Sequence, residues 1–206
     1  ERYHIDFSET SFILVEVGYA FNAVIAVDKG NIVDGLGGTS GGPGFITVGT
    51  IDAELAVRLS KFRGIVLYSG GAKDVSGKSD LTAEELARNH RQYANAWNML
   101  LESVAKGVAA MMVSVEKPKE ILLSGRLSRI PEIAQALQEK LARLGKVRKI
   151  GRHASIAKEA AEGAYIIGEG LLGGKYQSLV ETMELRGAKG TMYDYILLKG
   201  AEVEKP

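Results

Sequence analysis

The sequence contains no cysteine. Disulfides, thiolate zinc sites, iron–sulfur clusters and a cysteine nucleophile are therefore excluded, and the chain suits a reducing compartment. An excess of either charge is also missing, with 26 Lys and Arg against 25 Asp and Glu. Proteins that bind a polyphosphate backbone carry a basic excess, so we expect no nucleic-acid partner. Because the missing cysteines suit a reducing compartment, we expect the protein to be cytoplasmic.

Long apolar runs are absent too. Lys106 interrupts the most apolar stretch, around Val104 to Val115, which falls short of a bilayer span, so we expect no membrane partner. The three histidines, His4, His90 and His153, lack metal-ligand spacing, and no metal site is readable. What remains is a chain of 206 residues, 46% of them hydrophobic, which suffices for one well-packed domain.

Three short apolar runs lie near the start of the sequence, at Phe12 to Val17, Phe21 to Asp28 and Ile32 to Leu36. Asp28-Lys29-Gly30-Asn31 supplies turn chemistry between the last two runs. The pattern therefore predicts three successive antiparallel strands. Because the chain begins Glu1-Arg2-Tyr3 without a methionine, we expect it to start partway through a longer gene product.

The segment from about 37 to 80 is interpreted as an insertion after these strands. Its pattern predicts a helix near Ile51 to Phe62 and an extra strand from Ile65 to Ser69. A capping box of Thr82 and Glu85 then starts the next helix. Apolar residues recur at threes and fours from there, which predicts one helix over roughly thirty residues.

Strands and helices alternate in the remaining sequence. The pattern predicts strand Glu120 to Ser124, helix Pro131 to Leu144, strand Val147 to Ile150, a core helix from a Ser155 cap to about Leu172, a helix near Tyr176 to Leu185 and a strand-like Tyr193 to Leu198. Three antiparallel strands followed by alternating helices and strands is the ribonuclease-H-like order, an α/β fold. Other α/β sheets begin with a parallel strand–helix–strand unit instead.

Two segments rich in glycine are candidates for binding anions. In the turn after the first strand, Gly18 permits close approach and Asn22 can point at an anion, although an ordinary hairpin turn is the alternative. The loop from 35 to 44 has six glycines in ten positions, and its amides can donate to oxyanions, although a flexible linker is the alternative. No Lys follows in P-loop spacing. The candidate residues for phosphate or substrate are Gly18, Asn22, Asp34, Gly37, Gly38, Thr39, Gly41, Gly42 and Gly44.

A third candidate follows the buried strand that ends at Ser124. Ligands of open sheets gather at the carboxyl ends of strands, so Gly125 and Arg126 are placed to line a nucleotide pocket. A tight strand-to-helix connection is the alternative. Gly163 and the alanines around it give the last core helix a small face that can admit a flat adenine, although small residues also serve close helix packing.

Several stretches, taken in order and spacing, resemble segments of butyrate kinases. Those like the second phosphate segment and its following loop are Ile13–Gly18, Lys29–Asp34 and Gly41–Phe45. Ile121–Gly125 resembles their adenosine segment, and Glu162–Ile167 with Gly170–Tyr176 resembles their last helix and its exit. Across roughly residues 12 to 185, the chain is similar to an archaeal domain-of-unknown-function family labelled as predicted butyrate kinases.

The resemblance implies membership of the actin-like ATPase superfamily, in which two ribonuclease-H-like domains clamp ATP and Mg²⁺. Residues 1–206 would be the C-terminal domain, with the N-terminal partner domain outside this chain. The implied activity is ATP-dependent phosphate transfer to a small carboxylic acid, and the implied assembly is a homodimer. Gly18, Asn22 and the loop from Gly37 to Gly44 would hold the phosphates and the acid, while Gly125 and Arg126 would border the adenosine.

The chain departs from those kinases at two places. They have a His and a run of glycines at the hairpin, where this chain has Glu16 and then Gly18-Tyr19-Ala20. They also carry an arginine that stabilises the transferring phosphoryl group, where this chain reads Val48-Gly49-Thr50-Ile51-Asp52. A kinase would need a substitute cation, for which Lys73 and Lys78 are candidates; both lysines also suit solvent-facing turns.

Three classes of function remain open: a small-carboxylate kinase, a nucleotide-binding regulator without turnover, and a nuclease of the ribonuclease H type. A nuclease needs carboxylates at the ends of its strands to hold two metals, and the fourth strand ends in Ser124-Gly125 with no acid, so the nuclease ranks last. Sequence alone does not separate the kinase from the regulator. Fold by itself does not fix function either.

Overall fold

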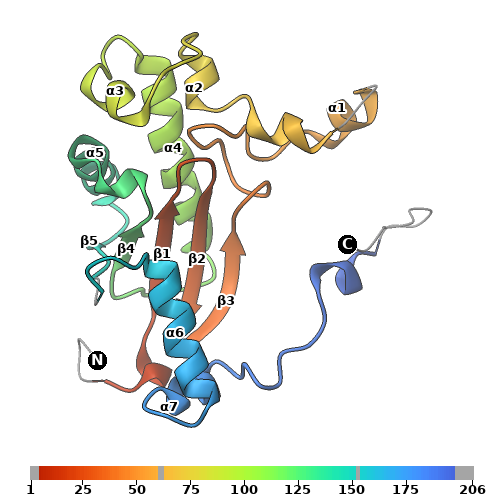
Figure 1. The fold of residues 1–206 in the computed structure, drawn as a ribbon, viewed down its shortest axis with the longest axis vertical. Coiled ribbons are helices and arrows are strands. Elements are labelled where there is room, and N and C mark those ends of the chain that lie inside the picture. Colours follow the sequence, from red (N-terminus) through yellow and green to blue (C-terminus); the bar gives the residue numbers. More distant parts are fainter. Residues whose placement is uncertain (1–4, 60–62, 152–153, 198–206) are drawn as a thin grey trace.

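The computed structural model describes residues 5–59, 63–151 and 154–197, and within them five strands form one mixed sheet in the order β3-β2-β1-β4-β5 (Figure 1). The strands are β1 (Phe12–Val17), β2 (Asn22–Asp28), β3 (Asn31–Leu36), β4 (Ile121–Ser124) and β5 (Val147–Lys149). β1, β2 and β3 pair antiparallel, whereas β4 pairs parallel with both β1 and β5. This topology confirms the predicted ribonuclease-H-like α/β fold.

Helices cover both faces of the sheet (Figure 1). The described α-helices are α1 (Ala53–Arg58), α2 (Ala72–Val75), α3 (Ala83–Arg88), α4 (Ala94–Met111), α5 (Pro131–Leu141), α6 (Glu159–Leu171) and α7 (Gln177–Thr182). Short 3₁₀ helices are η1 (Phe7–Glu9), η2 (Gly64–Tyr68), η3 (Leu127–Arg129) and η4 (Met192–Tyr195). α4 and α5 lie behind the sheet in Figure 1, and α6 and α7 lie in front of its lower part.

The main core lies between the sheet and α4. Successive side chains of a strand point to opposite faces, and on β1 the alternate residues Ile13, Val15 and Val17 are fully buried. Leu100 and Val108 of α4 belong to the same buried cluster. The other face of β1 is only half-buried, so the face under α4 supplies most of the burial that holds the sheet in place.

Two predicted strands are wrong. Ile65 to Ser69 forms the 3₁₀ helix η2, because a strand needs a hydrogen-bonded neighbour and only the single bridge from Thr47 to Gly70 adjoins this segment within the described chain. Ile65 is 72% exposed, so its apolar character marks no core position. The strand expected from Tyr193 to Leu198 is instead a 3₁₀ turn over Met192–Tyr195, and Leu198 lies outside the described residues.

The single long helix expected after Thr82 is also wrong, since the segment forms α3 and then α4. The chain leaves helical geometry at Asn89, with φ −110° and ψ 31°, and re-enters it after Tyr93. Only half of the predicted capping box forms: Thr82 Oγ1 accepts the Glu85 amide, whereas the Glu85 carboxylate accepts from Lys78 Nζ. The apolar residues keep their spacing of three and four across the break between α3 and α4, because both helices bury their apolar faces in the same core.

The helix expected from Ser155 begins later and is not a core helix. α6 starts at Glu159 after Lys158, whose side chain makes no capping bond, and among its residues only Gly170 is buried. The main partner of α6 is α7. Its small residues therefore do not serve close packing against the main core.

Thr82→Ala tests the α3 cap. Removing the hydroxyl leaves the Glu85 amide without its acceptor, so the free energy of unfolding should fall by about 1 kcal/mol in urea denaturation. Thr39→Ala is the matched control, because Thr39 is exposed and its change should stay within about 0.5 kcal/mol. Equal losses in both variants would contradict the assignment of Thr82 as the cap.

Candidate functional site

The candidate site forms where β1 and β4 end side by side. The two strands pair in parallel, with Glu16 opposite Ser124, so the residues that follow each strand emerge together. Gly125 has φ +91°, and a Cβ there would lie 2.5 Å from the carbonyl oxygen of Val17. Only glycine allows this close backbone approach at a positive φ. The exit of β4 is thereby held against the end of β1.

The hairpin turn between β1 and β2 packs against the exit of β4. The guanidinium of Arg126 lies 4.5 Å from the centroid of the Tyr19 ring, and the ring of Phe45 lies 5.1 Å from the same centroid. Tyr19 therefore contacts both the β4 exit and the glycine-rich loop. Gly18 is needed at the turn because its Cβ would meet the Phe21 carbonyl oxygen at 2.5 Å.

The glycine-rich loop is tied to the same hairpin. Thr47 Oγ1 donates to the carbonyl oxygen of Ala20 at 2.9 Å, and a Cβ at Gly44 would collide with that same carbonyl. Asn22 Nδ2 donates to the Pro43 carbonyl at 3.1 Å. Asn22 is 6% exposed, and its Oδ1 has no hydrogen-bond partner among the described residues. The hairpin, the loop and the β4 exit thus meet at one end of the sheet.

Hydrogen bonds within the loop leave four of its amides free. Ser40 closes a turn with Gly37, and the Gly41 carbonyl accepts both the amide and the hydroxyl of Thr50. Within the described chain, the amides that donate to no protein atom are those of Gly38, Thr39, Gly41 and Gly42. Free amides on a constrained loop are donors suited to phosphate or carboxylate oxygens.

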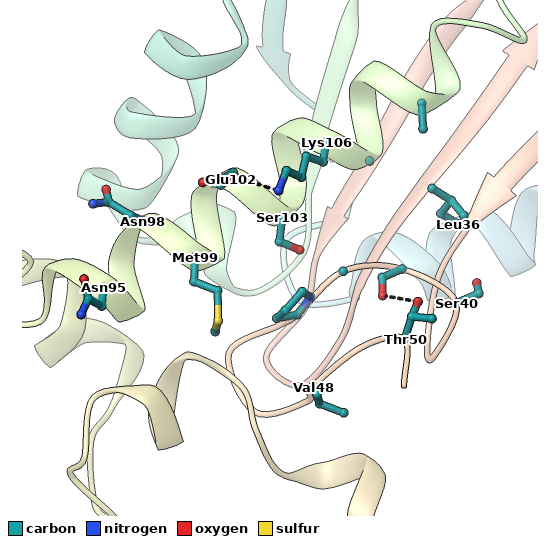
Figure 2. Close-up of a pocket in the computed structure, with 15 residues that line it drawn as sticks. Leu36, Ser40, Val48, Thr50, Asn95, Asn98, Met99, Glu102, Ser103 and Lys106 are labelled. Carbon is teal, nitrogen blue, oxygen red and sulfur yellow. Dashed lines mark hydrogen bonds and ion pairs between the residues drawn. The ribbon is translucent and has the colours of Figure 1, made fainter. Parts of the chain in front are cut away.

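A cavity of about 830 Å³ separates the loop from α4 (Figure 2). Gly41 and Gly42 line one wall, and Ser103 and Lys106 of α4 line the other. Ser103 is 8% exposed, and its Oγ has no hydrogen-bond partner among the described residues, which costs about 1–3 kcal/mol for a buried hydroxyl. Sequence reasoning missed these α4 residues, because the helical period marks the apolar stripe and gives no signal for polar neighbours.

One ion pair borders this cavity. Lys106 Nζ lies 2.7 Å from Glu102 Oε1, and this hydrogen bond and charge hold the pKa of the Glu102 carboxyl below its ordinary value. Both side chains are largely exposed, so the pair is readily exchanged for other partners.

A second cavity, of about 540 Å³, lies beside Arg126. Arg88, Arg126 and Arg129 line it together with the start of α5 at Pro131. Arg129 is paired with Glu159 of α6 at 2.6 Å. Glu84 and Glu132 also line this cavity, so Arg126 lies between the hairpin and a cavity with side chains of both charges.

Of the predicted site residues, only Gly41 and Gly42 line the first cavity and only Arg126 lines the second. Asp34 accepts from Ser114 Oγ at 2.7 Å and from the Gly35 amide, and these bonds hold the pKa of its carboxyl below its ordinary value. Gly163 lies on α6 and lines neither cavity. Lys78 is bound to Glu85, which raises the pKa of its ammonium group. Lys73 lies on α2 and does not line the cavity beside the loop.

The residues present fit the phosphates of a nucleotide better than a protein-held metal. The four free amides of the loop are donors for phosphate oxygens, whereas the unpartnered Asn22 Oδ1 beside the loop is an acceptor and requires a donor instead. In the described part of the chain, no three His, Cys, Asp or Glu side chains gather closely enough to hold a metal ion. Magnesium bound to phosphates takes one or two carboxylates and keeps several waters.

Among the helices that the structure describes, none is long and apolar enough to cross a membrane.

Comparison with known proteins identifies the family. A family model described as "Protein of unknown function (DUF1464)" matches residues 1–198. The chain belongs to this family. No curated protein sequence matches the DUF1464 chain.

Solved structures similar to the DUF1464 chain include two small-carboxylate kinases. Acetate kinase from Entamoeba histolytica matches with a TM-score of 0.57 and 19% identity, over 70% of this chain and 42% of the kinase. A propionate kinase from Francisella tularensis matches with a TM-score of 0.55 and 22% identity, over 66% of this chain and 39% of that one. The chain thus spans about two fifths of their length, and the likeness confirms the expected actin-like fold.

Gly125→Ala tests the contact that holds the two strand ends together. Alanine at φ +91° is strained and its Cβ meets the Val17 backbone, so the free energy of unfolding should fall by about 1–3 kcal/mol. Gly163→Ala is the control, because nothing lies within 4 Å of a Cβ there and a helix gains up to about 1 kcal/mol from the change. Equal stability of the two variants in urea would refute the proposed contact.

Ser114→Ala should raise the pKa of Asp34 towards its ordinary value, because the Ser114 hydroxyl is the largest cause of the lowered pKa. Since the folded pKa lies below the unfolded one, this bond stabilises the fold above the unfolded pKa, and the stabilisation is lost as pH falls through the folded pKa. A carboxyl ¹³C titration by NMR measures the shift. Ser114→Thr keeps the hydroxyl and should keep the low pKa; an unchanged pKa in Ser114→Ala contradicts the assignment.

Proposed function

We propose that the DUF1464 chain is the C-terminal half of an ATP-dependent kinase that phosphorylates a small, butyrate-like carboxylic acid. The supporting observation is the convergence of the β1–β2 hairpin, the glycine-rich loop and the β4 exit at one end of the sheet, with four free amides in the loop. The kinases of similar fold act on acetate and propionate by name. The butyrate label rests on the sequence resemblance alone.

In this proposal each segment has one task. Gly18 permits the tight hairpin turn that brings the segments together, and the amides from Gly38 to Gly42 donate to oxygens of the phosphates and of the acid. Gly125 and Arg126 border the adenosine, with the arginine-lined cavity beside them. Mg²⁺ would neutralise phosphate charge when bound. These residues orient the nucleotide, because phosphoryl transfer depends on positioning and on charge neutralisation.

The proposal assigns the rest of the clamp to other chains or domains. An N-terminal domain of the same protein would supply the second half of the nucleotide site, and two copies would associate into a homodimer. The N-terminal domain is proposed because the chain spans about two fifths of the kinases of similar fold, and the homodimer is proposed from the sequence resemblance alone.

A nucleotide-binding regulator without turnover is the second candidate. The stretch Val48-Gly49-Thr50-Ile51-Asp52 lacks the arginine that the resembling kinases carry there to stabilise the transferring group. Thr50 bonds to the Gly41 carbonyl, so this stretch lies directly beside the loop without a cation of its own. Removing such an arginine can cost on the order of a thousandfold in rate. Lys73 and Lys78 remain the candidate substitutes.

Arg126→Ala should weaken binding of a non-hydrolysable ATP analogue about tenfold in calorimetry on the protein at its natural full length. The guanidinium stacks on the ring of Tyr19 in the hairpin. Arg143→Ala is the control, because Arg143 is exposed and lies beyond the end of α5. Unchanged affinity in Arg126→Ala would remove Arg126 from the nucleotide site.

Turnover separates the kinase from the regulator. Incubation with ATP, Mg²⁺ and a panel of short carboxylic acids, with hydroxylamine to trap acyl phosphate, should yield a hydroxamate if the protein is a kinase. Nucleotide binding without hydroxamate from any acid favours the regulator. In an active enzyme, Lys73→Ala and Lys78→Ala should lower kcat more than nucleotide affinity if either lysine replaces the arginine.

A further inference from the structure

We propose that the cavity between the glycine-rich loop and α4 holds the acyl acceptor, a monocarboxylic acid whose apolar chain is longer than that of acetate. This inference rests on the proposed kinase function and deepens it by naming the substrate class and the residues that select it. The cavity of about 830 Å³ falls within the range of small-molecule sites (Figure 2).

Hydrogen-bond donors gather at one end of this cavity. The free amides of Gly41 and Gly42 lie on the loop, and Ser103 points from α4 towards them (Figure 2). A Cβ at Gly42 would lie 2.5 Å from Ser103 Oγ, so the loop and the hydroxyl are in close contact. The buried hydroxyl has no partner within the described chain, and a ligand oxygen supplies one. This group of donors favours an anionic ligand.

Five apolar residues line another part of the cavity, which also has the polar side chains of Ser40, Thr50, Asn95 and Asn98 in its wall. The apolar residues are Leu36, Pro43, Val48, Met99 and Ala110. Figure 2 shows Met99 pointing from α4 towards the loop and Val48 lying across from it. Methionine adapts to ligands of different shape, and each methylene buried on such a wall strengthens binding. The wall therefore favours an acid with an alkyl chain over acetate.

The ion pair between Lys106 and Glu102 sets the charge preference. Lys106 Nζ is 2.7 Å from Glu102 Oε1, and both side chains line the cavity from adjacent turns of α4. An incoming carboxylate competes with Glu102 for the lysine, and the exposed pair offers little resistance. Lys106 thus selects a carboxylate, and Glu102 weakens its binding.

Affinities for acetate, hexanoate and hexylamine, measured by NMR titration on the protein at its natural full length, test the assignment. Hexanoate should bind at least about tenfold tighter than acetate, because four methylenes reach the apolar wall, and hexylamine should not bind. Lys106→Met should weaken hexanoate binding about tenfold, whereas Glu102→Gln should strengthen it. Opposite effects of two partners of one ion pair distinguish a ligand contact from a structural role.

Ser103→Ala supplies a second readout. It should weaken hexanoate binding while leaving the free energy of unfolding equal or higher, because it deletes an unpartnered buried hydroxyl. Lys117→Met is the charge control and should bind hexanoate as the wild type does, because Lys117 is exposed and does not line the cavity. Equal affinity for acetate and hexanoate, or no binding of either acid, overturns this inference.

The outcomes separate this inference from the proposed kinase. If the variants change hexanoate affinity as expected but the protein binds no nucleotide, the acid site is retained and the kinase is rejected. Nucleotide binding and hydroxamate formation without an effect of Lys106→Met, Glu102→Gln or Ser103→Ala would retain the kinase and place its acid elsewhere.

Discussion

The parallel pairing of β1 with β4 is the contact on which the candidate site depends. It joins segments more than a hundred residues apart in the sequence, and it ends with Gly125 against the backbone of Val17. Because both strands point the same way, the hairpin after β1 and the turn after β4 emerge at one end of the sheet. Arg126 then reaches Tyr19, and Tyr19 in turn packs on Phe45 of the glycine-rich loop. Without that pairing the three segments have no common location.

The site relies on backbone amides and two cations, Arg126 and Lys106, more than on clustered acids. Amides fixed in a loop are donors that need no reorganisation when an anion arrives. Three hydroxyl groups fix the loop by donating to backbone carbonyls and leave these amides free. The pairs are Thr47 with Ala20, Thr50 with Gly41, and Ser40 with Gly37. The cost of this arrangement is visible in the orphaned Oγ of Ser103 and Oδ1 of Asn22. These are two of the three buried side-chain atoms without a hydrogen-bond partner in the described chain; the third, Glu120 Oε2, lies directly before β4.

The strands were predictable from sequence because alternation and turn residues act locally. β1 matches its predicted bounds, and β2, β3 and β4 differ from theirs by one residue. The wrong predictions lie where tertiary contacts decide the local structure. Ile65 to Ser69 has the composition of a strand but no neighbouring strand to pair with. The break between the helices at Asn89 is hidden because the spacing of apolar residues continues across it. The carboxyl-end rule made Gly125 and Arg126 candidates, and the glycine-rich pattern with the family resemblance made Gly18, Gly41 and Gly42 candidates for the same site. Ser103 and Lys106 were not, because their position beside Gly42 depends on how α4 crosses the sheet.

The central claim is that the hairpin, the loop and the β4 exit form one nucleotide site. The most direct measurement is amide chemical-shift mapping of the ¹⁵N-labelled protein, at its natural full length, with a non-hydrolysable ATP analogue. The account predicts perturbations at Gly18 to Asn22, Gly38 to Gly42, and Gly125 with Arg126, and none at Gly163. Perturbations confined to α6, or to only one of the three segments, would contradict it.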